Sequence, residues 1–240
     1  MKKKPLVWLS GITVIALVLY FGLGIFLGSV VRAGVNAFGP KLTQTKVEVD
    51  EAYISPLTGS GRLMGLSVGN PEGWSDNNAF TIGKISIKLK PFSIFSDTIE
   101  IDEIIIDEAV FLYETKIVSS NIKELLKNIE SFTSKGGTEP TAKDGKPIKF
   151  SVKRVQLTNS TAKLGVGPAA IPVPLPPMNL NNLGVDQGGI TPDELVTEIM
   201  QSVLSDIAGA TGKATLKAAS GLGASATQAA GAGIKKLFGK

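Results

Sequence analysis

Residues 99–106 read IEIDEIII, and this stretch decides the fold because isoleucine recurs at every second position on either side of a two-residue step. Alternation with a period of two is typical of a half-buried β-strand, with one face toward a core and the other toward water. The same layout occurs at residues 47–54 (VEVDEAYI), 82–89 and 150–157 (FSVKRVQL). The sequence therefore predicts a mainly β fold with a few helices.

Three of these stretches are similar to one another. They begin at residues 47, 99 and 150, so their offsets are 52 and 51. The first two share three acidic positions, Glu48/Glu100, Asp50/Asp102 and Glu51/Glu103, which the third replaces with Ser151, Lys153 and Arg154. The period indicates either a repeated β unit or a chance similarity between strands, and both interpretations stay open.

The two-residue step inside each stretch is typical of a β-bulge, which bends a strand and increases its twist. Bulges at matching places would curl an antiparallel sheet into a trough with an apolar inner face. The alternative is that the same residues fill an ordinary sandwich core with no groove. The candidate groove-lining residues are Ile85, Ile87, Leu89, Ile101, Ile104, Ile106, Val152, Val155 and Leu157.

Residues 6–31 contain no charged side chain and are almost entirely apolar. As a helix they would extend for about 39 Å, which is enough to cross a hydrocarbon core of about 30 Å. Lys2, Lys3 and Lys4 precede the stretch, so residues 1–5 are expected in the cytoplasm and the chain after Arg32 on the other side. A cleaved signal peptide is the alternative, although its apolar region is usually shorter. Gly24 and Gly28 match a pattern of packed membrane helices.

The remaining segments divide the exported part. A β domain is expected over residues 33–190, and it begins with a short helical continuation that stops at Gly39-Pro40. Within it, residues 121–132 are expected as an amphipathic helix, residues 134–146 as a flexible loop, and the proline-rich residues 169–180 as an extended edge. Thr191-Pro192-Asp193-Glu194 predicts the start of an amphipathic helix over residues 191–208. Residues 209–240 form a basic tail rich in Ala and Gly.

The composition argues against an enzyme. The chain has no histidine and no cysteine, which removes the commonest general base, the commonest metal ligand and all thiolate chemistry. The net charge is +4, and the three N-terminal lysines supply most of it, so the charge does not indicate nucleic-acid binding. Paired acids such as Asp102 and Glu103 are interpreted as parts of solvated strand faces. No catalytic, cofactor-binding or metal-binding residue is predicted, and no cofactor is expected.

In its order of features the chain resembles the AsmA family of bacterial envelope proteins. The resemblance comprises the Lys-rich start, the single span, ISPLTGSG at residues 54–61, LSVGNPEGW at residues 66–74, the isoleucine-rich strands from Ile82 and Ile101, the proline-rich segment and the Thr-Pro-Asp-Glu helix start. It implies a single-pass inner-membrane protein with a periplasmic, curved, groove-like sheet. Larger relatives are thought to carry phospholipids toward the outer membrane along such grooves.

Size sets a limit on what the resemblance implies. With seven or eight expected strands about 4.8 Å apart, the groove would be roughly 35 to 40 Å long, much less than the width of a periplasm. We therefore expect phospholipid handling and a part in outer-membrane or envelope biogenesis. The alternative is an envelope scaffold that binds other proteins or further copies of itself.

Overall fold

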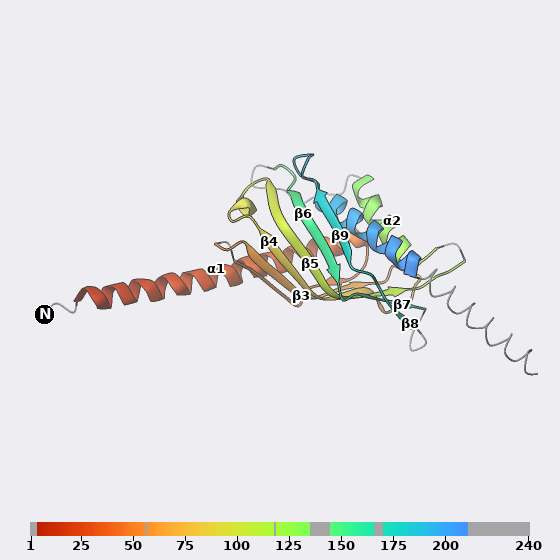
Figure 1. The fold of residues 1–240 in the computed structure, drawn as a ribbon, viewed down its shortest axis with the longest axis horizontal. Coiled ribbons are helices and arrows are strands. Elements are labelled where there is room, and N and C mark those ends of the chain that lie inside the picture. The colour runs from red at the N-terminus through yellow and green to blue at the C-terminus, as the bar shows by residue number, and fades with distance from the viewer. Residues whose placement is uncertain (1–3, 56, 118, 135–144, 166–169, 211–240) are drawn as a thin grey trace, which may run out of the picture.

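The computed structural model describes residues 4–55, 57–117, 119–134, 145–165 and 170–210 (Figure 1). In this part the chain is a mixed α/β fold with one sheet. A last helix covers residues 192–210. The other elements in chain order are α1 (Lys4–Thr43), β1 (Val47–Glu48), β2 (Glu51–Ser55), β3 (Ser60–Gly69), β4 (Asn78–Leu89), the 3-10 turn η1 (Ser93–Phe95), β5 (Thr98–Tyr113), α2 (Asn121–Ser134), β6 (Lys149–Thr158), β7 (Thr161–Leu164), β8 (Ile171–Pro174) and β9 (Met178–Leu183).

The nine described strands belong to one open sheet with the order β1-β3-β4-β5-β6-β9. β1 and β2 both pair with β3, so they act as one interrupted strand at the first edge. β6 and β7 lie in the same way beside β5, while β9 and β8 continue the second edge beside them. Strands were thus predicted correctly at all four alternating stretches.

The expectation of a wholly antiparallel sheet is wrong at one place. β5 pairs with β6 and β7 in parallel, and Ile101 lies opposite Val152 while Ile104 lies opposite Val155. The reason is the connection, because α2 carries the chain back along the sheet before β6 begins, and such a crossover joins parallel strands. The paired residues are 51 positions apart, which is the offset between the two similar stretches.

One predicted bulge is confirmed, because the register between β4 and β5 shifts at Lys88/Leu89, opposite the two-residue step of β5. The other two similar stretches show no shift at their steps: β6 keeps one register with β5 and with β9, and β1 and β2 keep one register with β3. A second line of irregularity crosses the sheet at Gly65, Glu108 and Asn159, all three of which have positive φ. Bulged strands bend and twist more strongly, and Figure 1 shows the strands curving around the helices.

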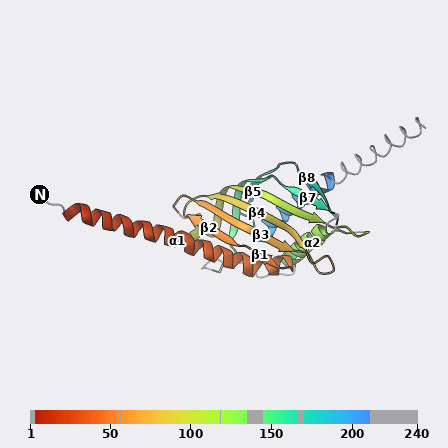
Figure 2. The same cartoon turned by 90° about the horizontal axis from the view of Figure 1, so that it is seen from below.

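Among the described residues, helices cover one face of the sheet. Figures 1 and 2 show α2 and the 192–210 helix on the same side of the strands, with α1 along the edge formed by β1 and β2. The main core joins inward residues of β4, β5 and β6 to Leu195, Val203 and Ile207 of the 192–210 helix. A second cluster joins Ile122, Leu125 and Ile129 of α2 to the C-terminal part of α1.

The expected stop at Gly39-Pro40 is wrong, because α1 continues through Pro40 to Thr43. Proline removes one backbone donor, which is a small loss near the end of a helix. The last turn is held instead by the Thr43 hydroxyl, which donates to the Gly39 carbonyl at 2.9 Å, and by the Gln44 N–H, which donates to the Pro40 carbonyl at 3.0 Å.

Other expected segments agree with the structure where it describes them. The amphipathic helix predicted at residues 121–132 is α2, and the helix predicted at residues 191–208 is the 192–210 helix. The proline-rich segment is extended, since β8 pairs with β7 at the edge. Most of the predicted loop, residues 135–144, and most of the basic tail, residues 211–240, lie outside the described residues.

Candidate functional site: the covered apolar face of the sheet

The structure brings the nine candidate groove residues together on one face of three adjacent strands. Ile85, Ile87 and Leu89 come from β4 and lie opposite Ile106, Ile104 and Ile101 of β5 in turn. The same three residues of β5 lie opposite Leu157, Val155 and Val152 of β6. Seven of the nine are buried, and Ile85 and Ile87 are half-buried. The face is thus continuous and apolar, as the alternation predicts.

This face is covered by the protein itself. The 192–210 helix contributes Leu195, Val203 and Ile207 to the same core, and the last two are at most 1% exposed. These residues follow the four-residue spacing that makes one helical stripe apolar. In the described part of the chain, the inner face of the sheet therefore forms one side of a hydrophobic core, and the 192–210 helix forms the other side.

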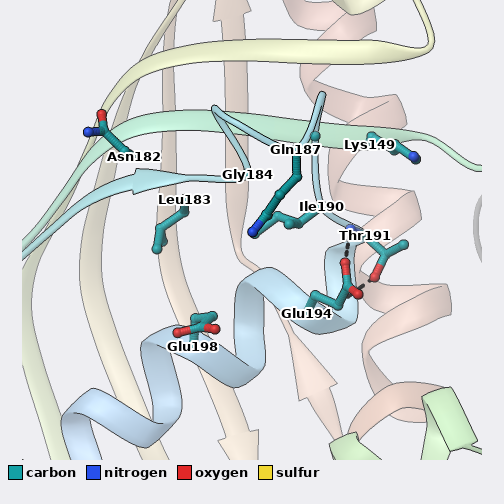
Figure 3. Close-up of a pocket in the computed structure, with 10 residues that line it drawn as sticks. Lys149, Asn182, Leu183, Gly184, Gln187, Ile190, Thr191, Glu194 and Glu198 are labelled. Carbon is teal, nitrogen blue, oxygen red and sulfur yellow. Dashed lines mark hydrogen bonds between the residues drawn. The ribbon is translucent and has the colours of Figure 1, made fainter.

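A pocket lies where the 192–210 helix begins (Figure 3). It has a volume of about 550 Å³, and its walls come from the start of β6, the end of β9 and the first two turns of the helix. Figure 3 shows Leu183 of β9 on one side and Glu198 of the helix on the other. Its polar lining includes Lys149, Glu194 and Glu198, so it forms a polar opening beside the apolar layer.

The helix start at this pocket is a capping box. The Thr191 N–H donates to the Glu194 carboxylate at 2.9 Å, and the Glu194 N–H donates to the Thr191 hydroxyl at 3.4 Å. This reciprocal pair satisfies two backbone donors at the first turn. The helix is joined to the sheet just before this point, because Phe150 and Ile190 exchange backbone hydrogen bonds at 2.7 and 2.8 Å. The N-terminal end of the 192–210 helix, which covers the apolar face, is thus attached to β6 of the sheet.

The acids of β5 form ion pairs with the bases of β6. Lys153 lies 2.6 Å from the Asp102 carboxylate, and Arg154 lies 3.0 Å from that of Glu103. The hydrogen bond from Lys153 holds the pKa of Asp102 below its usual value, against the opposing effect of desolvation. The Asp107 pKa is lowered too, chiefly because Asn159 and Thr158 donate to its carboxylate. The replacement of acids by bases in the third similar stretch thus produces complementary charges across the parallel pair.

Helix α1 occupies the edge at β1 and β2. A methyl group on Gly28 would lie 2.0 Å from the Ala52 carbonyl oxygen, and one on Gly24 would lie 2.9 Å from the Tyr53 ring. Arg32 Nε donates to the Val49 carbonyl at 2.9 Å, and Asn36 Oδ1 accepts from the Val49 N–H at 3.0 Å. The two glycines therefore allow close contact with β2, and two polar side chains hydrogen-bond the backbone of Val49 between β1 and β2.

Helix α1 is long and apolar enough to cross a membrane. Its N-terminal half projects from the domain in both views (Figures 1 and 2). Residues 24–31 of the predicted span run beside β2, so the projecting part begins N-terminal to Gly24. From Lys4 to Leu23 a helix extends for about 30 Å, which equals the thickness of a hydrocarbon core.

The site offers apolar contact and a polar opening. Among the described residues, there is no group of three or more Asp, Glu, His or Cys side chains that could hold a metal ion. The apolar face of β4, β5 and β6 can bury the aliphatic surface of a ligand.

Two features of the site were not predicted. The stripe of Leu195, Val203 and Ile207 indicated that one face of the last helix is buried, without indicating which surface it covers. The polar residues Arg32 and Asn36, four positions apart and following Gly24 and Gly28 at the same spacing, mark one face of α1. In the sequence, this four-residue spacing of small and polar residues was the one indication that α1 packs along a strand.

Comparison with known proteins provides no assignment: no family model, no curated protein and no solved structure matches this chain.

Proposed function

We propose that this protein is a single-pass envelope protein that accepts phospholipid acyl chains on the inner face of its sheet, beneath the 192–210 helix. The observation that supports this most is the continuous apolar face of β4, β5 and β6, which one helix near the end of the described chain covers. In this proposal the helix is displaced when a lipid enters. The anchor lies in the bacterial inner membrane, the N-terminus is cytoplasmic, and the domain takes part in outer-membrane or envelope biogenesis from the periplasm.

The helix and an acyl chain compete for the same apolar face. Leu195, Val203 and Ile207 contribute roughly 1.5–3 kcal/mol each to the burial of the helix, and buried Met200 and partly buried Ile199 add to this. An acyl chain gains about 0.8 kcal/mol for each methylene group that it buries from water. A lipid that leaves a bilayer gains much less, because its chain is already in an apolar environment. Without a lipid, the helix keeps the apolar face from water.

A second function, an envelope scaffold, is favoured by the second edge of the sheet. β9 is the last strand in the order, and within the described residues no strand pairs with its outer side. An open edge can add a strand from another protein or from a further copy of this chain. The first edge differs, since α1 covers it.

A helix lock tests the lipid proposal. The Gln201 side chain donates to the Glu130 carboxylate at 3.3 Å, so this pair links the cover helix to α2. Since the chain has no cysteine, Glu130→Cys with Gln201→Cys can be bridged selectively by a short bifunctional thiol reagent. The full chain is reconstituted in vesicles that contain a phospholipid with a photoreactive group on its acyl chain. After irradiation, the labelled peptides are mapped.

We expect peptides of β5 and β6 to carry the lipid label before bridging and to lose it after bridging. The two single-cysteine variants, treated with the same reagent, are the matched controls and should keep the label. Equal labelling of the strands in the bridged and unbridged protein would contradict displacement of the helix. Labelling confined to α1 in every sample would contradict the lipid function.

A further inference from the structure

We propose that the end of the domain from which α1 emerges lies on the membrane, with an apolar rim of Leu57, Phe92 and Phe95 inserted at the bilayer interface. The inference rests on the single-pass anchor of the proposed function and adds to it a second contact with the same membrane. The occupant of the rim is the phospholipid bilayer that α1 crosses.

The direction of α1 places the rim at the membrane. Gly24 lies against Tyr53, Gly28 against Ala52 and Arg32 against Val49, so α1 runs antiparallel to β1 and β2. Toward the membrane, the strand therefore leads to the hairpin between β2 and β3, where Leu57 is 61% exposed. Figure 1 shows this hairpin and η1 at the end of the domain from which α1 projects.

The two phenylalanines lie beside that hairpin. The Leu89 N–H donates to the Gly59 carbonyl at 2.7 Å, which joins the hairpin to the end of β4 just before η1. Phe92 and Phe95 are 61% and 69% exposed, whereas Ile94 between them packs on the main core. Phe92 also has a φ of 70°, a conformation that few residues other than glycine adopt. The turn thus packs its half-buried isoleucine against the core and leaves both phenylalanines exposed.

The distribution of exposed apolar residues supports the same orientation. On α1 itself Leu23, Ile25, Phe26 and Val30 are exposed, and they lie at the level where the helix meets the domain. Aromatic and aliphatic side chains at this depth suit the boundary between headgroups and acyl chains. Lys88 is exposed near the rim at the end of β4, where it can meet lipid phosphates, whereas Lys90 forms an ion pair with Glu100. Exposure of the Phe92 and Phe95 rings to water is unfavourable, and contact with the bilayer would remove this cost.

Depth measurements on the full chain test the rim. Since cysteine is absent, Phe95→Cys and Leu57→Cys each provide one labelling site. Ile117→Cys is the matched control, because Ile117 is fully exposed and follows β5 at the opposite end of the sheet. Ile12→Cys reports the anchor. Each variant carries an environment-sensitive fluorophore in vesicles of three parts phosphatidylcholine to one part phosphatidylglycerol, with a nitroxide quencher either at the headgroup or deep in the acyl chain.

We expect the labels at Phe95 and Leu57 to emit at shorter wavelength and to be quenched by the headgroup nitroxide. The label at Ile117 should show neither effect, and the label at Ile12 should be quenched by the deep nitroxide. Labels at Phe95 and Leu57 that behave like the one at Ile117, with Ile12 still quenched, would overturn the rim and leave the anchor intact. An unquenched Ile12 label would overturn the anchor, and the rim and the proposed function with it.

Discussion

Single residues explain how closely the parts of this protein fit together. Gly28 is needed because a strand carbonyl occupies the position that any side chain would take. Gly24 and Gly28 matched a membrane-helix pattern in the sequence, but a small-residue pattern indicates only that something approaches closely. Here it is the strand β2 of the same chain.

Gly28→Ala is expected to destabilise the full chain by about 1–3 kcal/mol, the usual cost of adding volume to a packed contact. The added methyl would lie 2.0 Å from a backbone oxygen, which cannot rotate away. Urea unfolding in detergent, followed by circular dichroism, measures the change. Gly22→Ala is the control, because nothing lies within 4 Å of a methyl at that position. An equal effect of both substitutions would show that helix propensity, and not the contact with β2, is responsible.

Asp102 gives the domain a dependence on pH. Because its pKa is lowered in the folded state, chiefly by the hydrogen bond from Lys153, its stabilising effect is present above the unfolded pKa of about 3.9 and is lost as pH falls through the folded value. The pair is exposed, so the effect is at most about 1 kcal/mol. Asp102→Asn should therefore be less stable than wild type at neutral pH and equally stable at strongly acidic pH.

The comparison needs unfolding free energies of both proteins over the acidic range. Glu72→Gln, which removes an exposed carboxylate before β4, is the control and should follow wild type throughout. A difference between Asp102→Asn and wild type that persists unchanged at the lowest pH would contradict the ionic origin of the effect.

At the scale of elements, α1 has two parts with different surroundings. The N-terminal half projects, and the C-terminal half caps the edge of the sheet. Unpaired strand edges promote association between sheets, so a helix that packs along β1 and β2 and hydrogen-bonds Val49 between them covers one of the two edges. The projecting half and the half that lies on the sheet are therefore parts of one continuous helix, with no loop between them.

Asn36→Ala is expected to cost about 1–3 kcal/mol, because the buried N–H of Val49 loses its acceptor. Unfolding in detergent gives the free energy, and size-exclusion chromatography shows whether the exposed edge causes association. Lys41→Ala, an exposed polar residue of the same helix, should leave both unchanged. A neutral Asn36→Ala would mean that water replaces the side chain and that α1 does not protect the edge.

Many of the strands and helices could be predicted from particular residues. Alternating isoleucines predicted the strands, Asn121 with Leu125 and Ile129 predicted α2, and Thr191-Pro192 predicted the last helix. The parallel direction of β6 could not be predicted, because a period of two is the same in either direction along a strand.

The surface that the last helix covers could not be predicted for a similar reason. An apolar stripe and an apolar sheet face each require a partner, but local patterns do not specify which partner. Among the described residues, the apolar face is neither an open groove nor the core between two sheets, the two alternatives that the sequence left open, because a helix packs on it.

At the scale of the whole molecule, the protein combines a long apolar helix, a sheet with one apolar face and a second helix that covers this face. The proposed function requires phospholipid to reach this face in the cell. The protein offers a matched pair of positions, because Ile104 lies on the covered face whereas its neighbour Ile105 lies opposite Ser86 and Gln156.

The most direct measurement is photocapture in living cells with a small photoreactive isoleucine analogue at position 104 or at position 105, followed by mass analysis of the purified full chain. If lipid enters beneath the helix, phospholipid is bound covalently at position 104 and none is bound at position 105. Capture of only protein segments from the 192–210 helix at position 104, under conditions where the anchor is in the membrane, would contradict the lipid function and favour the scaffold.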